Sequence, residues 1–279
     1  MKCPKCGSVV PDSDETCPTC RHYIGPPNVR AVRKPEETKA LQIRYEKALE
    51  IAEADGTSDQ LNKFETAMAK TCAVINVDLY YLHHFFLKDE PLYSTYSFQV
   101  RGQTRKSASA RDDQQRRGID GTILGGYAEE IRYAALSVDG SGLKSYGEYT
   151  MKLKEVAIAE RSTLLEDNSY HFVEKHKIIA GAKTPLGYRA IWGDRKKLTV
   201  AKLYKKITPQ TSENEFARIL LFSEGNRATD EFVEVHIYGA FDKNAVESVR
   251  GKFAASKKGA MAREVKEFIS KTGANWVEE

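Results

Sequence analysis

Long apolar runs are missing from this sequence, and so is a secretory leader. None of its 279 residues belongs to a stretch approaching the roughly 20 apolar residues that a membrane-spanning helix needs. The opening stretch MKCPKCGSVV has no apolar segment of the kind found in signal peptides. We therefore expect a cytoplasmic protein with no membrane partner.

Several catalytic signatures are also absent. The sequence contains no G-x-x-x-x-G-K-[ST] phosphate loop, no G-x-S-x-G nucleophile elbow and no H-E-x-x-H zinc motif. Residues 121–126, GTILGG, are rich in glycine but lack the spacing of a dinucleotide-binding Rossmann turn. Nothing in the sequence therefore supports a kinase or a dehydrogenase.

Cysteine is scarce, and its placement is uneven. Of the five cysteines, Cys72 stands alone in an apolar stretch that we interpret as helical, where a buried, unreactive thiol is expected. The other four form two C-P-x-C motifs: Cys3, Cys6, Cys17 and Cys20. Two such motifs can surround a Zn²⁺ ion with four thiolates, which closes its coordination and makes the site structural rather than catalytic. Two disulfides are the alternative, which a cytoplasmic setting disfavours. The segment resembles the short zinc ribbons that begin many bacterial proteins.

Charge of neither sign dominates the chain. The sequence has 43 Lys and Arg against 39 Asp and Glu, a formal net charge of +4. This balance permits a nucleic-acid partner without demanding one. Residues 101–118 are locally basic and include Arg116 and Arg117, which we consider as substrate contacts for nucleic-acid phosphates. A solvated loop is the alternative, and the lack of aromatic residues there argues against base stacking.

The patterns along the chain predict an α+β fold in four parts. A zinc ribbon occupies residues 1–25, and a proline-rich, charged linker follows at 26–36. Residues 37–118 form a helical region with the basic loop, in which the second helix is expected to run from about Asp59 into the apolar stretch 72–87. Residues 119–279 carry a mostly antiparallel sheet closed by terminal helices.

Within that last part the expected elements are as follows. Residues 146–154 alternate as a strand, and residues 196–207 alternate less cleanly. Residues 217–225 are a candidate buried strand, and residues 233–241 are a further strand. Residues 242–253 and 257–273 are expected to be helices, the second with an apolar side.

The β-rich half also holds an ordered set of polar residues. Tyr146 lies at a strand start, and Glu234 lies on the strand near the C-terminus. Between them come Arg161, Ser162, Thr163, Asn168 and Ser169. A guanidinium can bind a pyrophosphate with two hydrogen bonds, and hydroxyls can hold a glutamate and a ribose. A carboxylate can stabilise the oxocarbenium that forms when nicotinamide leaves NAD⁺. The set therefore suggests transfer of ADP-ribose from NAD⁺, with NAD as co-substrate.

The segments YGEYTMKLK, RSTLLEDNS and VEVHIYGAF resemble a pattern in bacterial ADP-ribosyltransferase-like toxin domains. The resemblance covers roughly residues 119–250 and implies that Glu234 is catalytic. It implies Ser162 or Thr163 in the strand-hydroxyl role, with Arg161 or Arg132 as the NAD-binding arginine. The sequence departs from the family at His236, because arginine-modifying members have Glu or Gln two residues from the catalytic glutamate. His236 is thus a candidate acceptor-side group.

Three functions follow as hypotheses. The favoured one is an NAD-dependent ADP-ribosyltransferase, an intracellular toxin or phage-defence effector that modifies RNA or DNA and needs an antitoxin or regulator as partner. The second is a non-catalytic adaptor, in which the ribbon and the basic loop bind nucleic acid or protein. The third is a hydrolase of NAD⁺ or nucleic acid. Each polar residue also has a plain alternative, because Glu234 can face water and Asn168 with Ser169 can form a turn.

Overall fold

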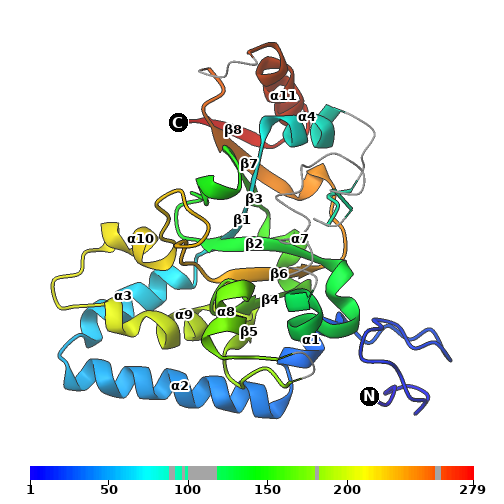
Figure 1. The fold of residues 1–279 in the computed structure, drawn as a ribbon, viewed down its shortest axis with the longest axis vertical. Coiled ribbons are helices and arrows are strands. Elements are labelled where there is room, and N and C mark those ends of the chain that lie inside the picture. Colours follow the sequence, from blue (N-terminus) through cyan, green and yellow to red (C-terminus); the bar gives the residue numbers. More distant parts are fainter. Residues whose placement is uncertain (88–91, 96–97, 100–117, 180–181, 255–258) are drawn as a thin grey trace.

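The framework of the protein is a single sheet, seen in a computed structural model that describes residues 1–279 except 88–91, 96–97, 100–117, 180–181 and 255–258. Its eight strands lie in the order β5-β4-β6-β2-β1-β3-β7-β8. They are β1 Cys72–Val77, β2 Ile131–Ser137, β3 Tyr149–Leu153, β4 Ser162–Leu165, β5 Arg189–Ile191, β6 Glu234–Tyr238, β7 Val246–Gly251 and β8 Asn275–Glu278. Every strand pairing in the described sheet is antiparallel except that of β7 with β8. The expected α+β fold with a mostly antiparallel sheet is confirmed (Figure 1).

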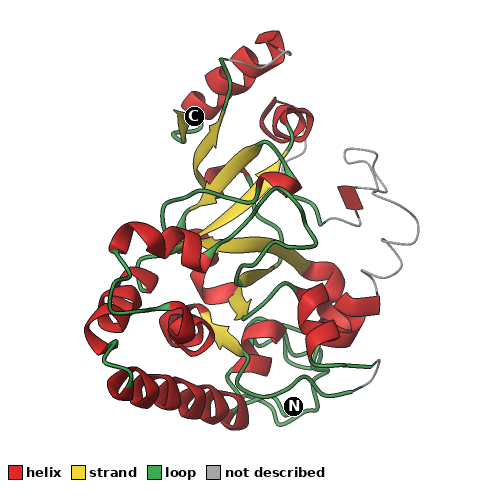
Figure 2. Cartoon of the chain, turned by 60° about the vertical axis from the view of Figure 1, so that its left-hand side comes forward, coloured by secondary structure: helices red, strands yellow, loops and turns green. Residues whose placement is uncertain are grey.

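Helices gather around both ends of this sheet (Figure 2). The α-helices are α1 Pro27–Val32, α2 Pro35–Ala54, α3 Ser58–Met68, α4 Leu79–Leu87, α7 Glu155–Ile158, α8 Ser169–Lys175, α9 Arg195–Leu203, α10 Phe216–Leu220 and α11 Gly259–Lys271. Two of the short 3₁₀ helices are η1 Gly125–Glu130, which precedes β2, and η2 Lys144–Tyr146, which precedes β3. α2 begins at a proline and has two glutamates in its first turn, which complement the helix dipole. No helix in the described ranges is long and apolar enough to cross a membrane.

The two faces of the sheet have different roles, as β6 illustrates. Val235 and Ile237 are fully buried in the main hydrophobic core, which also receives side chains from α2, α3, α4, α9 and α11. Because side chains alternate along a strand, Glu234 and His236 lie on the opposite face. That second face is covered by α8 and by the segment before β2, through a smaller cluster that includes Leu165 and Phe172.

The middle of the sheet opens into a fork. β1 and β2 pair only through Cys72–Val74 and Ala135–Ser137. The remainder of β1 pairs with β3, and the remainder of β2 pairs with β6. In Figure 1, β2 and β6 run across the view while β1 rises towards α4. The two strands therefore diverge on one side of their short common ladder and leave space between them.

Several expected elements are wrong, and each has a packing reason. Residues 72–77 are not helical but form β1, a central strand whose residues are almost all buried, so its sequence lacks alternation. Residues 196–207 and 217–225 contain the helices α9 and α10 instead of strands. α9 is enclosed by α2, α3 and β5, so its apolar residues are not confined to one stripe.

The expected helix at 242–253 is also wrong, because Val246–Gly251 form β7 after a single 3₁₀ turn at Lys243–Ala245. Its buried valines, Val246 and Val249, are three residues apart, which imitates helical spacing. The cause is a register shift opposite Lys152 and Leu153, which places Val246 against Leu153 and Val249 against Met151. The terminal helix is confirmed as α11, and it is followed by β8.

The segment predicted as a linker, 26–36, instead contains α1 and the start of α2. Pro26 precedes α1 and Pro27 opens it, which suits a first helical turn. Asn28 is buried, and its Nδ2 donates hydrogen bonds to the backbone carbonyls of Arg161 and His236, at 3.0 and 3.1 Å. α1 is therefore fixed to β4 and β6 rather than serving as a spacer. Arg30 of the same helix donates to the carbonyls of Asp12 and Asp14 in the N-terminal segment.

Candidate functional site

The four N-terminal cysteines come together as predicted. Their sulfur atoms all lie within 4.8 Å of one another, a spacing that lets Cys3, Cys6, Cys17 and Cys20 bind a metal ion such as zinc. Hydrogen bonds from the side chain and backbone of Ser8 lower the pKa of the Cys6 thiol to about 6. The thiolate that metal binding requires is thus readily formed there.

The two cysteine pairs sit on the same kind of turn. The amide of Gly7 donates to the carbonyl of Cys3, and the amide of Arg21 donates in the same way to the carbonyl of Cys17. Gly7 and Arg21 occupy equivalent positions, with φ of 74° and 55°. Glycine adopts this conformation without strain, whereas the second turn places a non-glycine residue in it. The repeated turn is what points both sulfur pairs at one centre.

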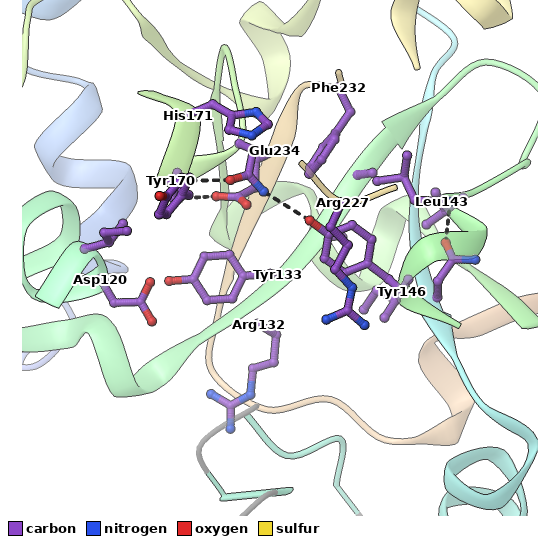
Figure 3. A pocket seen from close by; sticks show the side chains of 18 of the residues that line it. Asp120, Arg132, Tyr133, Leu143, Tyr146, Tyr170, His171, Arg227, Phe232 and Glu234 are labelled. Atoms are coloured by element: carbon purple, nitrogen blue, oxygen red, sulfur yellow. Dashed lines mark hydrogen bonds between the residues drawn. The ribbon is translucent and has the colours of Figure 1, made fainter. Parts of the chain in front are cut away.

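A cavity of about 740 Å³ lies at the fork between β1 and β2. Both strands line it, through Ile75 and Asn76 on one side and Tyr133 and Ala134 on the other. α8 contributes Ser169, Tyr170, His171 and Glu174, and β6 contributes Glu234. This size lies within the range of pockets that enclose a small-molecule ligand. Figure 3 shows the labelled side chains around it.

Glu234 is a buried carboxylate in the wall of this cavity, not a residue on a wet sheet face. It is 6% exposed. The hydroxyl of Ser169 donates to its Oε1 through a short hydrogen bond, and Nε2 of His236 lies 2.7 Å from the same oxygen. Hydrogen bonds to the charged form are what make a buried carboxylate tolerable. Glu234 and Ser169, predicted from separate segments, are thus brought into contact.

Ser169, His236 and Glu234 do not form a nucleophilic relay. In such a relay one imidazole nitrogen faces the serine and the other faces the acid. Here Nε2 of His236 faces both groups, 2.7 Å from Glu234 Oε1 and 3.5 Å from Ser169 Oγ. The serine hydroxyl already donates to the carboxylate. The geometry therefore supports a held carboxylate rather than an activated serine.

An aromatic wall with one cation lines the cavity beside Glu234, since Phe232 lies two residues before Glu234 in the chain. Tyr146 and Phe232 meet edge to face at 6.2 Å, and the Arg227 guanidinium lies 4.8 Å from the centre of the Tyr146 ring. The hydroxyl of Tyr146 accepts a hydrogen bond from Asn168, at 3.3 Å. Asn168 also caps α8 through the amide of Tyr170. The predicted Tyr146 and Asn168 therefore join the wall, together with Arg227, which the sequence motifs did not indicate.

A close steric contact explains why glycine follows Tyr146 in the turn before β3. A side chain at Gly147 would place its Cβ 2.4 Å from the backbone carbon of Val77. Nδ2 of Asn76 donates to the Gly147 carbonyl at 3.1 Å. This close approach of β1 and the turn after Tyr146 fixes the aromatic ring at the cavity.

Other predicted residues lie away from the cavity lining. Arg161 donates to the carbonyls of Ala157, Tyr238 and Ala240, so its guanidinium is used within the fold. Ser162 is fully buried, and Thr163 contacts Asn28. His236 is 2% exposed and contacts Glu234 rather than the open cavity. Arg116 and Arg117 lie outside the described residues.

Arg132, the alternative arginine, does line the cavity. It is 7% exposed and donates to the carbonyls of Glu130 and Tyr93, at 2.7 and 3.3 Å. Burial lowers its pKa, with the Glu130 charge opposing that shift. Figure 3 shows its side chain directed away from the cluster around Glu234.

No known protein family matches the sequence in a scan of family models, and a search of curated proteins finds no relative. The site therefore has to be interpreted from its own chemistry.

Proposed function

We propose that this chain is an NAD⁺-dependent ADP-ribosyltransferase whose active site is the cavity between β1 and β2. The observation that carries the proposal is Glu234, a buried carboxylate held by two side chains in the wall of a cavity of about 740 Å³. A fixed negative charge beside an aromatic wall suits a reaction in which positive charge develops on a ribose ring.

The proposed step breaks the bond between nicotinamide N1 and ribose C1′. The bonding electrons leave with nicotinamide, which departs neutral, and the ribose becomes an oxocarbenium. A nucleophilic oxygen or nitrogen of the acceptor then bonds to C1′ and loses its proton. Glu234 accepts a hydrogen bond from the ribose and stabilises the positive charge as it forms.

The remaining roles follow from where the residues lie. Tyr146 and Phe232, whose rings meet edge to face, provide apolar aromatic surface for a nucleobase or nicotinamide ring. Arg227 is exposed at the cavity and donates through Nε to the Ser145 carbonyl, and we assign its terminal nitrogens to a phosphate. We assign the pyrophosphate contact to Arg227 in place of Arg161, which does not line the cavity and whose Nε and Nη1 donate to backbone carbonyls.

The acceptor we propose is nucleic acid, with the protein acting as a toxin or defence effector under a regulator. Support comes from the cysteine-rich segment and the basic stretch 101–118 of the sequence. A non-catalytic adaptor is the competing function, and it predicts binding of nucleic acid without consumption of NAD⁺.

The test compares two glutamates that lie three residues apart. Glu234→Gln removes the charge in the cavity, whereas Glu231→Gln removes a half-exposed charge paired with Lys206. Purified full-length protein is incubated with labelled NAD⁺ and with RNA, DNA or protein, and nicotinamide release and label transfer are measured. We expect Glu234→Gln to lower both by about 100-fold or more, and Glu231→Gln to leave them within about threefold. Equal activity of the wild type and Glu234→Gln would refute the proposal. Nicotinamide release without a labelled acceptor would instead indicate an NAD⁺ hydrolase.

A further inference from the structure

His236 lies beside the proposed catalytic carboxylate but does not line the cavity. It lies on β6 two residues after Glu234, so both side chains are on the same face of the sheet. It is 2% exposed, and its ring meets Tyr133 of β2 edge to face at 5.2 Å. Tyr133 lines the cavity, but His236 does not. The imidazole is therefore separated from the cavity by Tyr133, and it can affect the proposed reaction only through its contact with Glu234.

The contact between the two side chains fixes which atom carries a proton. An ionised carboxylate can only accept hydrogen bonds, so Nε2 of His236, 2.7 Å from Oε1, must be protonated. Ser169 donates to the same oxygen from α8. Among the described residues none donates to Oε2, and Glu234 lines the cavity. One oxygen of the carboxylate is thus held by two donors, and the other is left for a ligand.

The two donors matter because the terminal torsion of a glutamate is soft. Rotation about χ3 of Glu has broad, roughly two-fold minima, so an unsupported carboxylate would sample several orientations. The donors come from different elements, β6 and α8, and so restrain the carboxylate in two directions. The backbone beneath His236 is restrained as well, since Asn28 of α1 donates to its carbonyl at 3.1 Å.

We infer that His236 is a positioning residue, which with Ser169 holds Oε1 of Glu234 so that Oε2 faces the cavity. This inference deepens the proposed function and rests on it for the consequence in catalysis. The geometry of the carboxylate itself is independent of that function. It also gives His236 a role different from acceptor recognition, because the acceptor cannot reach its ring past Tyr133.

The experiment uses two substitutions of His236 and one matched control. In His236→Gln, the amide nitrogen can stand near the position of Nε2 and donate to Oε1, whereas His236→Met has similar bulk and no donor. His83→Gln changes a histidine that lies outside the cavity lining and whose Nε2 is likewise close to a glutamate oxygen, 3.0 Å from Oε2 of Glu264. Nicotinamide release is measured with the full chain over a range of NAD⁺ concentrations, and unfolding temperatures are recorded for each variant.

We expect His236→Met to lower kcat by about 10- to 100-fold with little change in KM, because one charged hydrogen bond is lost. His236→Gln should recover to within about threefold of the wild type. His83→Gln should leave kcat within about threefold of the wild type. The inference would be overturned if His236→Met had the kcat of the wild type. It would also be overturned if His236→Met and His236→Gln lost kcat by the same factor.

A second readout keeps the inference separate from the proposed function. The Nε2 proton of His236 should give a downfield, slowly exchanging proton NMR signal in the wild type. That signal should move upfield in Glu234→Ala, because the acceptor is gone, and a crystal structure of His236→Met should show the Glu234 carboxylate turned. If the wild type consumes no NAD⁺, the proposed function fails, and these two measurements alone decide the inference. An unchanged signal in Glu234→Ala together with an unchanged carboxylate in His236→Met would overturn it.

Discussion

Under the proposed function, Arg227 binds the pyrophosphate and Arg161 stabilises the fold, and this difference between the two arginines can be measured. Replacing Arg161 by Met removes three hydrogen bonds to carbonyls, at 3.0, 2.9 and 2.8 Å. Each charged hydrogen bond contributes about 1.5–3 kcal/mol, but the guanidinium also loses hydration when it is partly buried. Its burial and the nearby Arg132 charge both lower the pKa of Arg161, which shows that this environment disfavours the cation. We therefore expect a net loss of about 3 kcal/mol in the free energy of unfolding rather than the full sum.

The matched variant is Arg227→Met. Arg227 is exposed and makes one hydrogen bond, to the Ser145 carbonyl at 2.9 Å, besides its contact with Tyr146. Its loss should change the free energy of unfolding by less than about 1 kcal/mol. If it contacts the pyrophosphate, NAD⁺ affinity should fall by about tenfold or more. Arg161→Met should leave that affinity within about threefold.

Thermal unfolding and calorimetric titration with NAD⁺ separate the two roles. A loss of about 3 kcal/mol corresponds to a fall of roughly 6–12 °C in Tm for a chain of this size class. The reasoning is refuted if Arg161→Met unfolds at the wild-type temperature while its NAD⁺ affinity collapses. It is refuted equally if both variants lose affinity by the same factor, because one arginine would then not be distinguished from the other.

Three further predictions concern regions outside the cavity wall or at its edge. Gly147→Ala should lower the free energy of unfolding by about 3 kcal/mol or more in urea titrations, because its Cβ would lie 2.4 Å from the Val77 backbone. Burial and the Glu65 carboxylate raise the pKa of Tyr45 to about 12, so its contribution is full below pH 10 and is lost as the pH rises from about 10 to 12. The difference in stability between the wild type and Tyr45→Phe, measured against pH, should shrink over that range. Metal analysis should find about one zinc ion per chain. Cys17→Ser should abolish zinc binding but leave the cooperative unfolding transition of the sheet in place.

What could be predicted from the sequence depends on whether the signal is local. The two C-P-x-C motifs each form their own turn, so the cysteine cluster follows from spacing alone. Glu234 and Ser169 were selected from separate segments and do meet, because both segments are adjacent to the sheet face that forms the cavity. Arg161 was predicted to bind NAD from its residue type and its order in the chain, whereas its side chain donates to carbonyls near the end of β6 and does not line the cavity. Nothing in the sequence around Arg227 shows that it would stack on Tyr146.

The errors in secondary structure have a common origin in tertiary packing. A short apolar run such as 72–77 fits a buried strand and a buried helix equally well when its period is hidden. β7 imitates a helix because a register shift opposite β3 puts Val246 and Val249 on one face. Both cases depend on a neighbouring strand that lies far away in the sequence, and no window of 12 residues contains that information.

The strand order has a consequence for how this protein acquires its site. β1 lies between β2 and β3, and β6 lies between β4 and β2, so the central ladders join residues that are up to about 100 positions apart. Such non-local pairing raises the contact order and slows folding. During synthesis on the ribosome, the cavity cannot form before β6 has emerged. Until then, the strands made earlier have edges without a pairing partner. The cavity of this fold is therefore incomplete until the chain has been synthesised as far as β6, at residues 234–238.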